Sequence, residues 1–302
     1  MGGACHCSHA RRSPRRKINL NLQMEEIMAA EIGILVMHGI GIQNKNFADG
    51  LIDEMNGRLQ DLGILPGTVA WKSAFWADLL TPNEEELWKK MSTGYDLDWG
   101  TVRKFIINVL ADALAYQRDP GEEEDMYRRI HTRFREDLSD LRNSLGGQDK
   151  PLIILAHSLG SVIVSNYIWD EQRKNKYCIG RDPFERMETL ASLVTFGSNI
   201  PLFTLALPDP KSIDFPPAQL PANLKKAAKW LNFFDPDDVL GYPLKPLSQS
   251  YGNTVSKDVE INSGSLFASW NPISHTEYWT DDDFTKPVAE LIRDVDLARK
   301  FM

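Results

Sequence analysis

The sequence predicts an α/β protein built on a parallel sheet, and two patterns indicate this class. Short, continuous apolar segments recur along the chain, for example at residues 32–37 and 152–156, and they suit strands that are buried on both faces. Between them lie longer segments with apolar residues at three-to-four spacing, as in helices that cover a sheet. Strands that alternate with helices favour a mostly parallel sheet with helices on both faces.

The expected elements follow one another without an internal repeat and give about six strands. In chain order they are a strand at 32–37, a helix at 46–60, strands at 68–75 and 152–156, a helix that reaches about Arg173, and strands at 190–196, 230–234 and 258–261. The last helix is expected to begin near Pro287, because proline is favoured in a first helical turn.

The segment between Trp76 and Pro151 is long for one connection between two strands. Residues 122–141 have the pattern of the helix that crosses over the sheet, whereas residues 101–117 form an additional amphipathic helix. This additional helix is either part of the core or a mobile lid over a site. We therefore expect one domain over residues 29–302, with residues 77–120 as the candidate for a cap insertion.

Residues 1–28 precede the first strand and differ from the rest of the chain in charge. The protein has 302 residues with 34 Lys plus Arg and 42 Asp plus Glu, whereas residues 1–24 contain five basic residues and no acid. The net charge of −8 therefore leaves −8 − 5 = −13 on the remainder, which argues against a nucleic-acid partner. We expect a disordered basic tail, or sequence upstream of a start at Met24 or Met28.

Cysteine usage and the lack of long apolar runs indicate the compartment. The tail has no apolar run of the kind found in secretory signals, and no segment reaches the ~18 apolar residues of a membrane span. Cys5 and Cys7 lack the spacing of a structural zinc site, and Cys178 is isolated. We therefore expect a cytoplasmic protein without a metal, a cofactor or stable membrane insertion, and the oligomeric state stays open.

The strongest local pattern is an apolar strand that runs through Ala156-His157-Ser158-Leu159-Gly160 into a helix. A serine on so tight a turn needs small residues two positions before and after it, because larger side chains would collide with the strand and helix. The pattern resembles the nucleophile elbow of α/β-hydrolase-fold serine esterases and lipases, with Ala156 in place of the more usual glycine. The resemblance implies that fold and a nucleophilic role for Ser158.

A nucleophilic serine needs a base and an acid that orients it, and in this fold the chain order is serine, acid, histidine. Of the six histidines only His275 follows Ser158, so elimination within that order selects His275 as the base. Three aspartates follow the strand at 230–234, namely Asp235, Asp237 and Asp238. The turn resembles that of DDHD-type and class 3 lipase-like hydrolases, which implies Asp238 as the acid, with Asp235 as the alternative.

Acyl transfer also needs two backbone N–H groups that receive the negative oxygen of the tetrahedral intermediate. In this fold one donor is the residue after the nucleophile, here Leu159, and the other lies in a loop after an earlier strand. Resemblance to the family's His-Gly loop implies the N–H of Ile40. A dinucleotide-binding interpretation of residues 39–41 fails because the third glycine and the acidic partner are missing.

Together these motifs predict a metal-independent serine hydrolase that cleaves carboxylic esters through an acyl-enzyme. The expected substrate is a small-molecule or lipid ester, as for a carboxylesterase or a lipase-like enzyme. The alternatives are an acyltransferase, thioesterase or amidase with the same triad, and a binding module of this fold without turnover. The sequence does not separate these alternatives, because the acyl acceptor is chosen by pocket shape and water exclusion.

Overall fold

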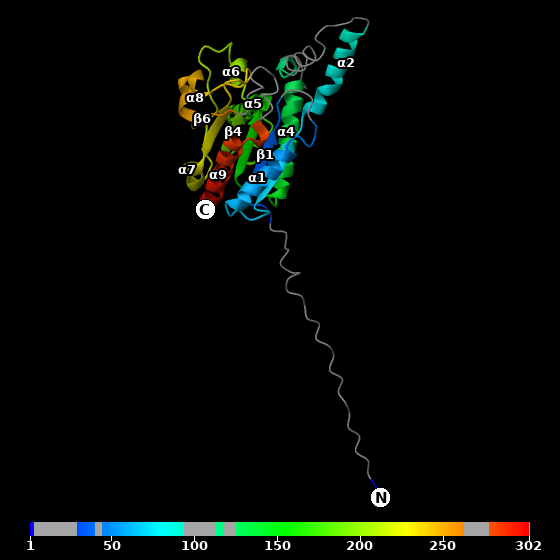
Figure 1. The fold of residues 1–302 in the computed structure, drawn as a ribbon, viewed down its shortest axis with the longest axis vertical. Coiled ribbons are helices and arrows are strands. Elements are labelled where there is room, and N and C mark those ends of the chain that lie inside the picture. The colour runs from blue at the N-terminus through cyan, green and yellow to red at the C-terminus, as the bar shows by residue number, and fades with distance from the viewer. Residues whose placement is uncertain (3–28, 40–43, 94–112, 118–124, 263–277, 302) are drawn as a thin grey trace.

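The computed structural model describes residues 1–2, 29–39, 44–93, 113–117, 125–262 and 278–301 (Figure 1). Its core is one six-stranded sheet in the order β2-β1-β3-β4-β5-β6, in which every pair of neighbours is parallel. The strands are β1 (Ile32–Met37), β2 (Val69–Ala74), β3 (Leu152–His157), β4 (Leu190–Phe196), β5 (Lys229–Phe234) and β6 (Lys257–Glu260).

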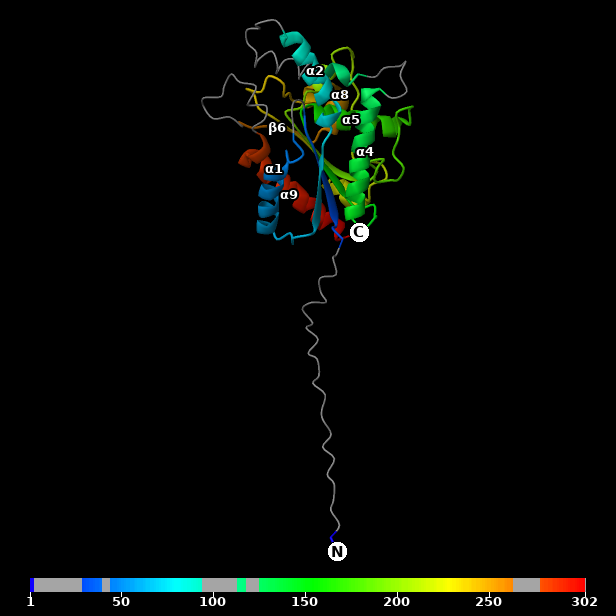
Figure 2. The ribbon, with the colours of Figure 1, turned by 90° about the vertical axis from the view of Figure 1, so that its right-hand side faces the viewer.

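Helices cover both faces of the sheet. They are α1 (Asp49–Asp61), α2 (Thr81–Ser92), α4 (Met126–Ser144), α5 (Leu159–Arg173), α6 (Ile200–Phe203), α7 (Ala222–Ala227), α8 (Gln249–Thr254) and α9 (Asp282–Arg299), with short 3-10 turns η2 (Ala77–Leu79) and η3 (Lys245–Leu247). Figure 2 shows α1 and α9 on one side of the strands and α4 and α5 on the other.

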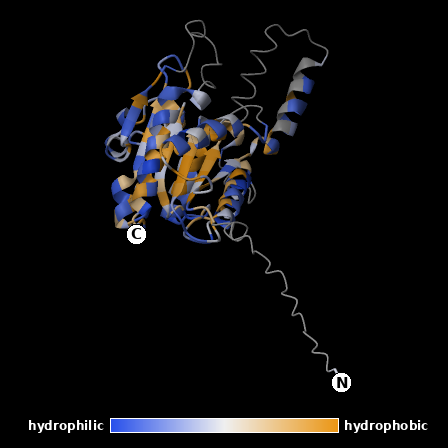
Figure 3. Cartoon of the chain, turned by 60° about the horizontal axis from the view of Figure 1, so that its bottom comes forward, coloured by the Kyte–Doolittle hydropathy of each residue, from blue (hydrophilic) through white to orange (hydrophobic). Residues whose placement is uncertain are grey.

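Two apolar cores, one on each face, explain why the central strands read as continuous apolar runs. Successive side chains of a strand point to opposite faces. Leu35 and Met37 accordingly pack into the core under α4 and α5, whereas Ile34 and Val36 pack into the core under α1 and α9. Every residue of β1, β3 and β4 is buried, and Figure 3 shows the strands as the most hydrophobic part of the fold.

Acidic side chains precede the two longest helices. Asp125 precedes α4 and accepts a hydrogen bond of 2.8 Å from the Arg128 amide, and Asp281 precedes α9 and accepts one of 2.7 Å from the Asp283 amide. The prediction that the last helix begins near Pro287 is wrong, because α9 starts at Asp282 and Pro287 lies inside it. The cap and the buried Phe284 add a turn before the proline.

The connection after β2 contains a helix that the sequence analysis missed. The short turn η2 follows the carboxyl end of the edge strand β2, and helix α2 comes directly after it. In Figure 1, α2 points away from the sheet. Most of the additional helix predicted at residues 101–117 lies outside the described residues, as does the tail at 3–28. The cap insertion at 77–120 and the disordered tail therefore stay predictions.

The sheet and its connections confirm the predicted fold class. Six parallel strands with helices on both faces, and a strand β3 that turns at Ser158 directly into α5, make an α/β-hydrolase fold with a reduced sheet. The structure has all six strands parallel, where a mostly parallel sheet was expected. None of the helices in the described ranges has both the length and the apolar character needed to span a bilayer.

Candidate active site

The candidate site lies along the edge where the parallel strands end. Because β1, β3, β4 and β5 point the same way, the residues that follow them meet at one edge, which is where α/β proteins bind ligands. His38 and Gly39 follow β1, Ser158 follows β3, and the aspartates follow β5. The backbone joins these ends, since the Ser158 amide donates 3.0 Å to the Phe196 carbonyl at the end of β4.

Ser158 has a backbone conformation that serine rarely adopts. Its φ of 51° and ψ of −126° place it in a region that favours glycine, at a cost of about 1–3 kcal/mol. Serine is a preferred residue at the start of a helix, yet its side chain makes no cap hydrogen bond to α5. The backbone is therefore strained where it places a buried hydroxyl between β3 and α5. Such strain concentrates at functional sites.

Two glycines at this turn lie so close to their neighbours that no side chain fits at either position. A Cβ on Gly39 would overlap the Ser158 Cβ and would lie 3.0 Å from the Ser158 Oγ. A Cβ on Gly160 would lie 2.6 Å from the His38 carbonyl and 2.9 Å from the Met37 side chain. The small residue predicted at position 160 is thus required by the neighbouring strand β1 and its loop.

His38 is a fixed, neutral part of the loop after β1. Its ring stacks on Trp76 with centroids 4.9 Å apart, and the Trp76 amide donates 3.2 Å to its Nε2. Its Nδ1 lies 2.8 Å from the Gly39 carbonyl, and burial lowers the pKa of His38 to about 4. The imidazole is therefore uncharged at neutral pH and holds the main chain that leads into residues 40–43.

Asp238 is buried and held by two donors. Its Oδ2 accepts a hydrogen bond of 2.8 Å from the Tyr278 hydroxyl, and its Oδ1 accepts one of 2.9 Å from the Leu240 amide. A Cβ on Gly241 would overlap Oδ2, so the following turn is built to fit this carboxylate. Among the described residues, the position predicted for the triad acid is thus a specifically held carboxylate.

Asp235, the alternative acid, is equally buried and, like Asp238, accepts a hydrogen bond from the backbone amide two residues later. Its Oδ1 accepts a hydrogen bond of 2.8 Å from the Asp237 amide, which is the usual contact of a turn-forming aspartate. Its amide donates 3.0 Å to the Tyr278 hydroxyl. Burial and the neighbouring Asp238 raise the pKa of Tyr278, so this phenol stays protonated and can donate to Asp238.

The described residues thus contain part of the predicted site. They include Ser158, the backbone of Leu159, Asp235 and Asp238, which the fold brings to one edge. His275, the predicted base, and Ile40, the predicted second oxyanion donor, lie outside the described residues. Their roles stay predictions.

Two residues of this edge had no assigned role in the sequence analysis. Tyr278 was not singled out there, and Trp76 was named only as the start of a long segment. Tyr278 joins the two aspartates, and Trp76 also donates 3.2 Å from its Nε1 to the His38 carbonyl. These contacts span 38 to 43 positions along the chain, so no local pattern would have found them.

A cavity of about 520 Å³ begins one helical turn beyond Ser158. Val162 of α5 and Ile200 of α6 line it. Val162 follows Ser158 by one helical turn, and Ile200 follows the end of β4, whose last carbonyl accepts a hydrogen bond from the Ser158 amide. Its other lining includes the aromatic side chains Trp169, Phe203, Tyr116 and Tyr251. Polar side chains, among them Asn166, Asp209 and Lys211, complete the wall. A volume in this range, lined by apolar and aromatic side chains with some polar groups, is typical of small-molecule sites.

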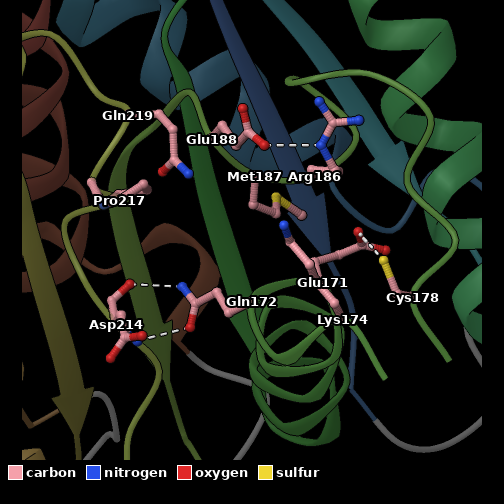
Figure 4. Close-up of a pocket in the computed structure, with 11 residues that line it drawn as sticks. Glu171, Gln172, Lys174, Cys178, Arg186, Met187, Glu188, Asp214, Pro217 and Gln219 are labelled. Carbon is pink, nitrogen blue, oxygen red and sulfur yellow. Dashed lines mark hydrogen bonds and ion pairs between the residues drawn. The ribbon is translucent and has the colours of Figure 1, made fainter. Parts of the chain in front are cut away.

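A second cavity, of about 590 Å³, lies at the opposite end of the sheet and is shown in Figure 4. Glu188 lies just before β4 begins, whereas Ser158 follows the end of β3. Several of its polar groups are paired with one another, since Arg186 pairs with Glu188 over 2.9 Å and the Gln172 side chain bonds the Asp214 backbone. This cavity is separate from the candidate active site.

Comparison with solved structures finds proteins of similar fold, and one of them is an esterase. The crystal structure of esterase PE8 aligns with 88% of this chain and 94% of its own at 12% sequence identity, with a TM-score of 0.39. No model of a protein family matches the sequence, and no curated protein matches it either. The assignment of fold therefore rests on the sheet and the turn at Ser158, and that of function on the site.

Proposed function

We propose that this protein is a serine hydrolase that cleaves carboxylic esters through an acyl-enzyme on Ser158. The observation that carries the proposal is the strained backbone of Ser158, at φ 51° between β3 and α5. A glycine would adopt this turn without strain, so the strained conformation is explained by a need for the serine side chain at this position. Ser158 Oγ would attack the ester carbonyl, and the alcohol would leave with a proton from the base.

The rest of the machinery is assigned from the sequence and is consistent with the described residues around it. His275 would accept and return the proton, and Asp238 would orient the imidazole. Three residues of chain reach at most about 11 Å, so a histidine three positions before Tyr278 is within reach of the edge where Tyr278 binds Asp238. The amides of Leu159 and Ile40 would receive the oxyanion.

Labelling with a fluorophosphonate tests the nucleophile directly. The wild-type protein should be labelled at one residue, and Ser158→Ala should abolish the labelling because the attacking oxygen is gone. Ser144→Ala, which removes an exposed serine at the end of α4, is the matched control and should label normally. Folded wild-type protein that stays unlabelled, or Ser158→Ala protein that is still labelled, would contradict the proposal.

Substitution of the two acids separates their roles. Asp238→Asn should lower kcat by about 10³–10⁴, as expected when the group that orients the imidazole is lost. Asp235→Asn should keep more activity and should mainly weaken the turn that its carboxylate caps. If Asp235→Asn is instead the inactive variant, Asp235 is the triad acid.

The substrate class follows from the cavity beyond Ser158. Its apolar and aromatic side chains favour the hydrocarbon part of an ester, and its charged lining residues, Asp209 and Lys211, pair with each other. p-Nitrophenyl esters of increasing chain length, compared with matched thioesters and anilides, would show which acyl compounds are hydrolysed. A higher kcat/KM for a thioester or an anilide than for the matched ester would assign the site to thioester or amide cleavage.

A further inference from the structure

The wall of the cavity beyond Ser158 carries a connected set of polar side chains. The Tyr116 Oη lies 2.7 Å from the His131 Nε2, and the Asn166 side-chain amide donates to the same Oη over 3.3 Å. Behind this contact, the His131 Nδ1 lies 3.9 Å from the Asp170 Oδ2. Tyr116, His131 and Asp170 are buried, whereas Asn166 is half-buried and lines the cavity.

The inner end of this set is firmly anchored. Asp170 accepts 2.6 Å hydrogen bonds from the Tyr127 hydroxyl at Oδ2 and from the Asn175 side-chain Nδ2 at Oδ1. A buried carboxylate is tolerated only when such donors compensate its lost hydration. The rings of Tyr127 and His131 are in contact at 4.0 Å between centroids, and Tyr127 stacks on Tyr116 at 4.9 Å. Tyr116 is therefore held in one position.

This anchoring fixes which atom Asn166 can offer to a ligand. Because its Nδ2 donates to Tyr116, the orientation of its side-chain amide is set. Within the part of the chain that the structure describes, no group donates to its Oδ1. A carbonyl oxygen accepts hydrogen bonds only, so a ligand group that pairs with it has to be a donor.

The surroundings make this polar contact selective. Val162, Trp169 and Ile200 line the same cavity and provide apolar surface, and its charged lining residues, Asp209 and Lys211, pair with each other. In such surroundings a polar ligand group without a partner is penalised, and one with a partner is accepted. Asn166 lies seven residues after Leu159 along α5, which places it about 10 Å along the helix from the start of the turn that holds Ser158.

We propose that this cavity binds an acyl chain that carries a hydroxyl group about 10 Å from its ester carbonyl. Asn166 accepts the hydrogen bond of that hydroxyl, and Tyr116 is a positioning residue that orients the Asn166 amide. The identification of the ligand as an acyl group rests on the proposed function, whereas the polar contact rests on the cavity alone.

Binding of free acids tests the contact without requiring turnover. Decanoate and ω-hydroxydecanoate would be titrated into the full-length wild-type protein by calorimetry, and the hydroxy acid should bind about tenfold more tightly, as expected for one buried hydrogen bond. Asn166→Leu and Tyr116→Phe should each remove most of that preference. Tyr167→Phe is the matched control, because its buried hydroxyl donates 2.9 Å to the Glu185 carbonyl and does not line the cavity.

Each outcome decides the proposal. Equal affinities of the two acids for the wild-type protein, or binding of neither, would overturn it. A Tyr116→Phe variant that binds both acids more weakly but keeps the preference would show a structural tyrosine and would also overturn it, and Asn166→Leu provides the same test if Tyr116→Phe fails to fold. A hydroxyl preference in protein that fluorophosphonate does not label would support this subsite while the proposed hydrolase function fails.

Discussion

Replacement of Gly241 by alanine should move the carboxylate of Asp238 and little else. The added Cβ would overlap Asp238 Oδ2 and would lie 3.0 Å from both the Asp238 Cγ and the Gly197 Cα. The Gly197 backbone resists displacement because its amide donates 3.1 Å to the Phe233 carbonyl within the sheet. The side chain of Asp238 therefore has to rotate away, whereas the Asp235 carboxylate stays bonded to its own turn.

The size of the effect follows from the contacts that this rotation breaks. Asp238 would lose its hydrogen bonds from Tyr278 and Leu240, and bonds to a charged group contribute about 1.5–3 kcal/mol each. Partial relaxation should leave a loss of about 2–4 kcal/mol in the free energy of unfolding. A displacement of about 1 Å in an orienting group lowers turnover on the order of 10²-fold, so kcat should fall by at least that factor.

The assay compares Gly241→Ala with a matched glycine variant. Gly57 lies on the exposed face of α1 with open space around it, so Gly57→Ala should keep full activity and gain about 0.5–1 kcal/mol of stability. Urea unfolding gives the stability, and hydrolysis of p-nitrophenyl butyrate gives kcat and KM at a temperature where both variants are folded. Wild-type kcat in Gly241→Ala protein would refute Asp238 as the triad acid and would leave Asp235.

Three further outcomes are expected. Tyr278→Phe removes two buried hydrogen bonds and should lower both kcat and the free energy of unfolding, the latter by about 1–3 kcal/mol; unchanged kcat would exclude a supporting role for this hydroxyl. Burial raises the pKa of Asp137 to about 6, so protonation of this carboxyl favours the folded state at low pH. Burial lowers the pKa of His38 to about 4, so protonation of this imidazole disfavours the folded state at low pH. Without the Asp137 contribution, Asp137→Asn should lose about 1–3 kcal/mol more stability than wild type between neutral pH and pH 4 in urea titrations. Ser158→Gly should be more stable than Ser158→Ala by about 1–2 kcal/mol in the same assay, the reverse of the usual order, because glycine relieves the positive φ.

The parts of the fold that the sequence predicts well are those determined by neighbouring residues. The apolar runs at β1 and β3 have to be buried on both faces. A small residue at position 160 was also expected, although the contacts that require it come from β1 and its loop. The prediction for the last helix failed because Pro287 was read alone, whereas the Asp281 cap and the burial of Phe284 begin the helix earlier.

The contacts that complete the site are beyond local patterns. Tyr278 reaches Asp238 across 40 positions, and Tyr127 reaches Asp170 across 43. Such pairs form because parallel strands and their crossover helices bring distant segments to one edge, and their partners have no fixed spacing in the sequence. The sequence around a tyrosine in a loop or a histidine in a helix does not show which residues it contacts, because the packing of distant segments determines those contacts.

The arrangement around Ser158 combines several costs that a purely structural turn would avoid. A glycine at this position would remove the strain, and larger residues at Gly39 and Gly160 would add apolar contacts to the core if they did not strike the serine or the loop before it. The hydroxyl is buried and makes no cap bond to the helix that it precedes. Natural chains retain such local violations mainly where function depends on them. The strained φ of Ser158 and the close approach of Gly39 to its side chain therefore favour a chemical role for Ser158 over a structural one.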